Sequence, residues 1–156
     1  MDRTSNFSAN CDAIASRCAL FATRRLARTL TRLYDAELTA TGLRGTQFNV
    51  LVAIARSRGR TLTELGDALG MDRTTLTHAL RPLRRAHLVR DANNIDRRVR
   101  TVELTSLGKQ RVSAGMVGWQ RAQEQVEATR SAVDWSELNA QLRRLNRLLI
   151  VDGQSQ

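Results

Sequence analysis

Residues 61–105 decide the fold, and they read TLTELGDALGMDRTTLTHALRPLRRAHLVRDANNIDRRVRTVELT. The stretch opens with a capping box, in which Thr61 and Glu64 stand three residues apart at the head of a short helix. Gly70 is placed to close that helix, and Asp72 is placed to cap a second one directly after it. Two helices joined by so short a turn are typical of a helix-turn-helix.

The second helix is predicted to extend over residues 72–86. Leu76, Leu80 and Leu83 recur at three- and four-residue steps and form its apolar face. Pro82 lies well inside the helix, where it removes a backbone donor and crowds the preceding turn. We therefore expect a kink or a locally weakened helix at this residue.

A basic hairpin is predicted after the second helix. The segments 88–90 and 99–104 are short and β-like, and the polar segment 91–97 lies between them. A hairpin that follows a helix-turn-helix completes a winged helix. The sequence therefore predicts a mainly α fold with a two-stranded β wing.

Helices are predicted on both sides of this module. Residues 11–40 show helical periodicity, whereas residues 1–10 are polar and are expected to be irregular. A further helix is expected from about Thr46, a long one after the capping residue Thr105, and a last one from the capping box at Asp134. The apolar stripe of this last helix fits either a contact within the chain or a seam between two chains.

The charge of the chain is concentrated in its middle third. The formal net charge is +10, and residues 56–111 carry 13 basic and 6 acidic side chains, or +7 of that total. A GC-rich gene would explain the preference for Arg over Lys, but it would not explain why the excess lies on one module. The pattern indicates a polyanion as partner.

Several classes of protein are disfavoured by the sequence. The 156 residues fit one domain, and there is neither an apolar run long enough to span a membrane nor a signal-peptide pattern, so we expect a cytoplasmic protein. The chain offers no phosphate-binding Gly-rich loop, paired carboxylates or nucleophile–base pattern, and we expect no enzyme and no cofactor. No Cys/His set has metal-ligand spacing, and His78 and His87 lie in or next to the basic helix.

The polar face of the second helix carries the residue types that contact DNA. Those near its N-terminus are placed for base edges in the major groove: Arg73, Thr74, Thr75, Thr77 and His78. Those farther along are placed for phosphates: Arg81, Arg84 and Arg85. The hairpin adds Asp96, Arg97, Arg98 and Arg100. Because a narrow minor groove attracts arginine, helix and hairpin together predict binding of double-stranded DNA.

The segment resembles the MarR (multiple antibiotic resistance regulator) family of dimeric transcription factors over about residues 18–110. The matching motifs are LGDALG (65–70), MDRTTLT (71–77), LV (88–89), DRR (96–98) and LT (104–105) with Gly108. The resemblance implies that Arg98 enters the minor groove, that Asp96 forms a salt bridge with it in the wing, and that the second helix is the recognition helix. His87 departs from the family, which usually has Gly there, at a position that favours a left-handed backbone.

The resemblance also implies an organisation and a function. The chain would be a single MarR-type domain over residues 1–156, with a winged-helix region at 46–105 and dimerisation helices at 11–40 and 105–152. It would act as a sequence-specific repressor, binding a pseudo-palindromic operator as a homodimer under control of a small molecule or an oxidant. The alternative is a winged-helix module that binds protein without operator specificity.

The sequence does not identify the effector. Cys11 and Cys18 are the candidates for oxidant sensing, although the peroxide-sensing branch of the family would place its reactive cysteine at Leu20. A disulfide between Cys11 and Cys18 within one helix is excluded, because seven residues separate them by about 10 Å. The aromatic side chains of Tyr34, Trp119 and Trp135 either line a ligand cavity or belong to the core.

Overall fold

The computed structural model describes residues 3–57, 59–92, 100–131 and 133–153. Its elements follow the predicted order, and the fold is mainly α with a small antiparallel sheet. In chain order they are α1 (Arg3–Arg17), α2 (Ala19–Leu38), η1 (Thr39–Thr41), α3 (Gly45–Arg56), α4 (Leu62–Leu69), α5 (Arg73–Arg85), β1 (Val89–Asp91), β2 (Val102–Leu104), α6 (Ser106–Glu127), η2 (Ala128–Ser131) and α7 (Trp135–Gly153). None of the helices in these ranges combines the length and the apolar composition that a membrane span requires.

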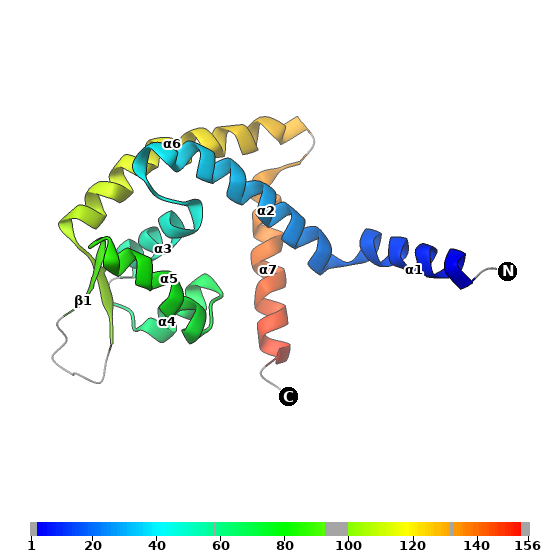
Figure 1. Ribbon diagram of the computed structural model, residues 1–156, viewed down its shortest axis with the longest axis horizontal. Helices are drawn as coiled ribbons and strands as arrows, with labels where there is room; N and C mark the ends of the chain where they lie inside the picture. Colours follow the sequence, from blue (N-terminus) through cyan, green and yellow to red (C-terminus); the bar gives the residue numbers. More distant parts are fainter. Residues whose placement is uncertain (1–2, 58, 93–99, 132, 154–156) are drawn as a thin grey trace.

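The elements form a winged helix that packs against a pair of long helices. Helices α2 and α6 lie side by side, and α3, α4, α5 and the hairpin lie beneath one end of the pair (Figure 1). Helix α1 extends away from the body beyond the start of α2, and α7 turns back from the far end of α6. The winged-helix prediction is confirmed.

The core lies where α3, α4 and α5 meet. The predicted apolar face of α5 is buried: Leu76, Leu80 and Leu83 are each no more than 2% exposed. They join a cluster with Leu51 of α3 and Leu65 of α4, both equally buried. Burying one such side chain stabilises the fold by about 1.5–3 kcal/mol, so this cluster fixes the orientation of α5.

Side-chain caps set the ends of α4 and α5. Thr61 Oγ1 accepts a hydrogen bond from the backbone N–H of Glu64 at 3.2 Å, and the Glu64 carboxylate accepts one from the N–H of Thr61 at 2.8 Å. Asp72 accepts a bond from the N–H of Thr75 at 2.7 Å. Gly70 ends α4 in the left-handed conformation, at φ 63°. These local predictions are confirmed.

The hairpin pairs in antiparallel register. Val89 lies opposite Leu104, and Asp91 lies opposite Val102. The first strand covers Val89–Asp91 and so begins one residue later than the predicted 88–90. The predicted second strand is shorter than expected within the described residues, because its ladder begins at Val102. A further bridge joins Thr101 to Thr61, so the hairpin is tied to the start of α4 as well as to α5.

The N-terminal prediction was wrong in two respects. Residues 3–10 are helical rather than irregular, and the helix expected over 11–40 is interrupted at Cys18, whose ψ is 111°. Residues 3–17 contain neither Pro nor Gly, the two residues that most disfavour a helix. Their polar composition is therefore compatible with the helix that forms there. No helix-breaking residue marks the interruption, which is why periodicity did not reveal it.

Pro82 does not interrupt α5, which continues to Arg85. The missing N–H of a proline removes one hydrogen bond to the carbonyl four residues earlier. That loss falls in the last turns of the helix, between the buried Leu80 and Leu83. The leucine contacts on both sides explain why the expected weakening does not end the helix there.

The turn after α5 forms a Schellman motif with His87 in the left-handed conformation, at φ 54°. The His87 N–H donates to the Arg84 carbonyl at 3.0 Å, and the Leu88 N–H donates to the Leu83 carbonyl at 2.9 Å. Thr105 Oγ1 donates to the His87 carbonyl at 2.7 Å and fixes the turn against the start of α6. The left-handed backbone expected at His87 is thus observed without a glycine.

Helices α2 and α6 approach each other closely at Gly118. A Cβ atom added at this glycine would lie 2.4 Å from the carbonyl oxygen of Glu37. The Arg121 guanidinium donates to the Glu37 carboxylate at 2.9 Å one turn farther along. Backbone contact and ion pair together hold α2 against α6.

Replacing His87 by glycine should stabilise the protein. Glycine adopts the left-handed backbone without steric cost, so we expect His87→Gly to raise the free energy of unfolding by roughly 0.5–1 kcal/mol. Urea denaturation measures the change. Ala86→Gly is the matched control, because Ala86 has φ −82° and gains nothing from glycine there. If His87→Gly lowers the free energy of unfolding as much as Ala86→Gly does, the backbone at His87 is not strained.

Candidate nucleic-acid interface

Helix α5 presents two faces of opposite character. Leu76, Leu80 and Leu83 anchor one face in the core, while the other face is open to solvent. The exposed side chains include all of the predicted base-contacting residues and the first of the predicted phosphate-contacting ones: Arg73, Thr74, Thr75, Thr77, His78 and Arg81. The buried face therefore holds the polar face outward.

The threonines on this face differ in what their hydroxyls do. Thr75 Oγ1 donates to the Asp72 carboxylate at 2.9 Å, and Thr77 Oγ1 donates to the Arg73 carbonyl at 2.7 Å. Both hydroxyl protons are thus used inside the helix. What Thr75 and Thr77 still offer to a partner is a methyl group and an acceptor oxygen, which suits thymine methyls and base-edge donors.

Asp72 holds the first turn of α5 in place. The backbone N–H of Thr75, and after it the Thr75 hydroxyl, lower the pKa of the Asp72 carboxyl below its ordinary value. The carboxylate therefore stays charged at neutral pH, where it also complements the positive end of the helix dipole. Its role is to order the turn that presents Arg73 and Thr74.

Arg84 lies in a different environment from the other arginines of α5. Its guanidinium contacts the Asp91 carboxylate of β1 at 2.5 Å, and the Arg84 side chain is 34% exposed. Its Nε atom is buried and has no partner among the described atoms. Arg84 thus links the end of α5 to the hairpin, and the phosphate contact predicted for it would compete with this ion pair.

The tip of the wing lies outside the described residues. This applies to Asp96, Arg97 and Arg98, whose predicted roles in the minor groove stay predictions. Of the described hairpin, Arg90 donates to the Glu103 carboxylate at 2.8 Å and Arg100 is exposed. Arg100, just before β2, therefore adds an exposed positive charge to the described part of the hairpin.

A pocket lies between α2, α6 and α3, the first helix of the winged-helix region. It has a volume of about 240 Å³ and is lined by Leu30, Thr31, Tyr34, Gly45, Thr46, Asn49 and Trp119. Tyr34 donates its hydroxyl to Gln123 Oε1 at 2.7 Å, and burial followed by the nearby Glu127 raises the pKa of this phenol. Two of the three predicted aromatics, Tyr34 and Trp119, border the pocket, whereas Trp135 is not among its lining residues.

The two cysteines are free. Cys11 is exposed on α1, and Cys18 is half-buried at the break between α1 and α2. Among the described residues, no group of three or more His, Cys, Asp or Glu side chains is arranged to hold a metal ion.

Two sets of polar contacts between the helices could not be predicted from the sequence. Asp35 Oδ1 accepts a hydrogen bond from the Gly45 N–H at 2.6 Å and joins α2 to α3. Hydrogen bonds from Arg121 and Gln125 lower the pKa of Glu37 and join α2 to α6. Each pairs residues from different helices, and no spacing along the chain signals such a pair.

Comparison with known proteins places this site in a family. A model of the MarR family matches residues 41–98. The transcriptional regulator MosR of M. tuberculosis, solved in complex with DNA, is 35% identical over 86% of this chain and 98% of its own, with a TM-score of 0.78. A second MosR crystal structure is 33% identical over 88% and 98%, with a TM-score of 0.75.

More distant structures share the fold. A MarR mutant from E. coli complexed with operator DNA is 22% identical over 87% of this chain and 97% of its own, with a TM-score of 0.70. At that identity the likeness concerns the fold alone. A comparison with curated protein sequences finds no match. The MosR identity over nearly its whole length and the family match across the winged helix show that this chain belongs to the MarR family of transcriptional regulators.

Proposed function

We propose that the chain is a cytoplasmic, sequence-specific repressor that binds a pseudo-palindromic operator in double-stranded DNA as a homodimer. The observation that carries the proposal is α5, whose leucine face is buried while Arg73, His78 and Arg81 are exposed. MosR, at 35% identity, has been crystallised with DNA. A helix anchored in this way can enter the major groove with its N-terminal residues against base edges.

The wing would add the second contact. Arg98, with Asp96 as its partner and Arg97 beside it, is proposed to reach the minor groove next to the site of α5. Arg81 and Arg85 are proposed to contact phosphates, since both are exposed farther along α5. Phosphate contacts position the protein, and base-edge contacts select the sequence.

The homodimer is proposed to form through the long helices outside the winged helix. These helices carry large apolar side chains that are each at least 40% exposed: Phe7 and Ile14 on α1, Leu20, Phe21 and Leu26 on α2, and Leu145, Leu148 and Leu149 on α7. A second copy would bury them and set the two α5 helices about 34–36 Å apart, the spacing of successive major grooves. The operator would then share the two-fold symmetry of the dimer.

The effector is proposed to be a small molecule in the pocket beside Tyr34 and Trp119. The pocket touches α2 and α6, which are proposed to dimerise, and α3, which packs under α5. A ligand that moves α2 relative to α3 would change the spacing of the two α5 helices and so the affinity for DNA. An oxidant acting at Cys11 or Cys18 is the other effector class that the proposal retains.

Removing the first arginine of α5 tests the interface. We expect Arg73→Ala to weaken operator binding by about 1–3 kcal/mol, the scale of a lost base-edge contact. Fluorescence anisotropy with a labelled operator duplex measures the change. Arg143→Ala on α7 removes the same charge from an exposed site outside the winged helix and should leave the affinity nearly unchanged. Equal losses of affinity in the two variants would contradict the assignment of α5 to the DNA interface.

A charge placed on the exposed apolar stripe of α7 tests the dimer. Size-exclusion chromatography with light scattering should give twice the chain mass of 17.5 kDa for the unmodified protein. We expect Leu148→Glu to shift the mass toward one chain, because a buried unpaired carboxylate is strongly unfavourable. Ala68→Glu, on the exposed side of α4, should leave the mass unchanged. A monomeric unmodified protein that binds the operator tightly would contradict the proposal.

A further inference from the structure

Arg84 joins the two elements of the proposed DNA interface. It lies in the last turn of α5, and its guanidinium contacts the carboxylate of Asp91, the last residue of β1, at 2.5 Å. The left-handed turn at His87 separates the two elements along the chain. The ion pair therefore closes a loop that leads from the end of the helix, through the turn, to the end of the first strand.

Asp91 is held at a defined place on the hairpin. It lies opposite Val102 of β2, which is 3% exposed, and the N–H of the next residue, Ala92, donates to the Thr101 carbonyl at 3.0 Å. The two strands are thus still paired at the point where Arg84 contacts them. Because the backbone is hydrogen-bonded there, fixing Asp91 against α5 also fixes the direction in which the hairpin leaves the helix.

The second ion pair of the hairpin has a different effect. Arg90 of β1 donates to Glu103 of β2 at 2.8 Å, and the two residues lie opposite each other in the ladder. Successive side chains of a strand point to opposite faces, so this pair and Asp91 lie on opposite faces of the hairpin. The hairpin therefore carries one carboxylate that joins it to α5 and one that joins its own strands.

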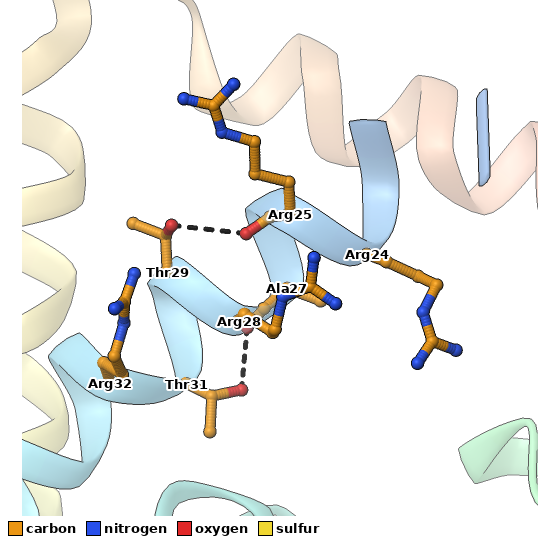
Figure 2. A pocket seen from close by; sticks show the side chains of 7 residues that line it. All are labelled: Arg24, Arg25, Ala27, Arg28, Thr29, Thr31 and Arg32. Atoms are coloured by element: carbon orange, nitrogen blue, oxygen red, sulfur yellow. Dashed lines mark hydrogen bonds between the residues drawn. The ribbon is translucent and has the colours of Figure 1, made fainter. Parts of the chain in front are cut away.

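Arg84 also differs from the arginines that are open to solvent. On α2, Arg24, Arg28 and Arg32 are exposed, form no ion pair within the described part of the chain and spread apart along the helix (Figure 2). The Arg84 side chain is 34% exposed, its Nε atom is buried, and one terminal nitrogen contacts Asp91. A phosphate contact by Arg84 would have to break this ion pair.

We propose that Arg84 is a positioning residue for operator binding: its ion pair with Asp91 holds the hairpin in a fixed direction relative to α5, and Arg84 itself contacts no phosphate. The proposal rests on the DNA binding proposed above and replaces the phosphate contact that the sequence predicts for Arg84. Two elements already held in the geometry of the complex lose less conformational freedom on binding. Because exposed ion pairs add little to the stability of a fold, the pair should affect DNA affinity more than stability.

Removing the Asp91 carboxylate separates the two roles of Arg84, because it leaves the guanidinium without its partner. Fluorescence anisotropy with a labelled duplex from upstream of this chain's own gene measures the change. If Arg84 is a positioning residue, Asp91→Asn should bind this duplex about fivefold more weakly than the unmodified protein. If Arg84 contacts a phosphate, its release from Asp91 should leave the affinity unchanged or raise it, and that result would overturn the proposal.

Glu103→Gln is the matched control. It removes the other paired carboxylate of the hairpin, changes the net charge by the same amount and also leaves an arginine unpaired. Since the link to α5 is intact in this variant, its affinity should change by less than about twofold. A loss in Glu103→Gln as large as that in Asp91→Asn would overturn the proposal.

The salt dependence of binding gives a second readout. Arg84→Gln should weaken binding about as much as Asp91→Asn, and the double variant no more than either, because each removes the same ion pair. The slope of log affinity against log salt concentration should stay as in the unmodified protein, because no phosphate contact is lost. A slope reduced by about one would assign a phosphate contact to Arg84 and would overturn the proposal.

Exchanging the two charges tests the position of the hairpin directly. The variant Arg84→Glu, Asp91→Arg can form the ion pair in reverse and should recover the affinity to within about twofold of the unmodified protein. A glutamate cannot replace a phosphate contact, so recovery excludes that role. An exchanged variant that is folded by circular dichroism but binds as weakly as Asp91→Asn would overturn the proposal.

The conservative variant Asp91→Asn decides the question if the exchanged variant does not fold. Circular dichroism at the titration temperature should show Asp91→Asn as fully folded as the unmodified protein; a loss of affinity explained by a smaller folded fraction would overturn the proposal. If the unmodified protein does not bind the duplex, the proposed function fails together with the positioning role. If it binds and Asp91→Asn binds equally well, only the positioning role fails.

Discussion

The burial of three leucines beneath α5 is the interaction on which the rest of the structure depends. Leu76, Leu80 and Leu83 leave this helix a single way to face the core formed with α3 and α4. Because the helix is continuous from Arg73 to Arg85, fixing one face also fixes the other. The outward direction of Arg73 and His78 is thus a consequence of hydrophobic packing, and it holds without DNA.

A second constraint connects this module to the long helices. The backbones of α2 and α6 meet at Gly118, and Glu37 pairs with Arg121 beside that contact. The pocket at Tyr34 opens between this helix pair and α3. A ligand in this pocket would therefore contact the helices proposed to form the dimer, α2 and α6, and also α3, which packs against α5. The proposed effector mechanism requires both contacts.

The parts of the fold that sequence predicted well are those determined by neighbours along the chain. The capping box at Thr61, the leucine face of α5 and the antiparallel hairpin each depend on residues a few positions apart. The break at Cys18 carries no local signal, and contacts such as Arg84 with Asp91 arise only once separate elements have come together. The exposure of the α5 residues that are proposed to contact DNA followed from helical periodicity, but the hydrogen bond of Thr77 and the ion pair of Arg84 did not.

The most direct measurement is a binding titration across salt concentrations, comparing the duplex upstream of this chain's own gene with a shuffled duplex of the same composition. Phosphate contacts by basic side chains make affinity fall steeply with salt, whereas base-edge contacts separate the two sequences. The account predicts a steep salt dependence for both duplexes and tighter binding of the upstream one at every salt concentration. Absence of binding to either duplex, in protein shown to be folded and dimeric, would contradict it.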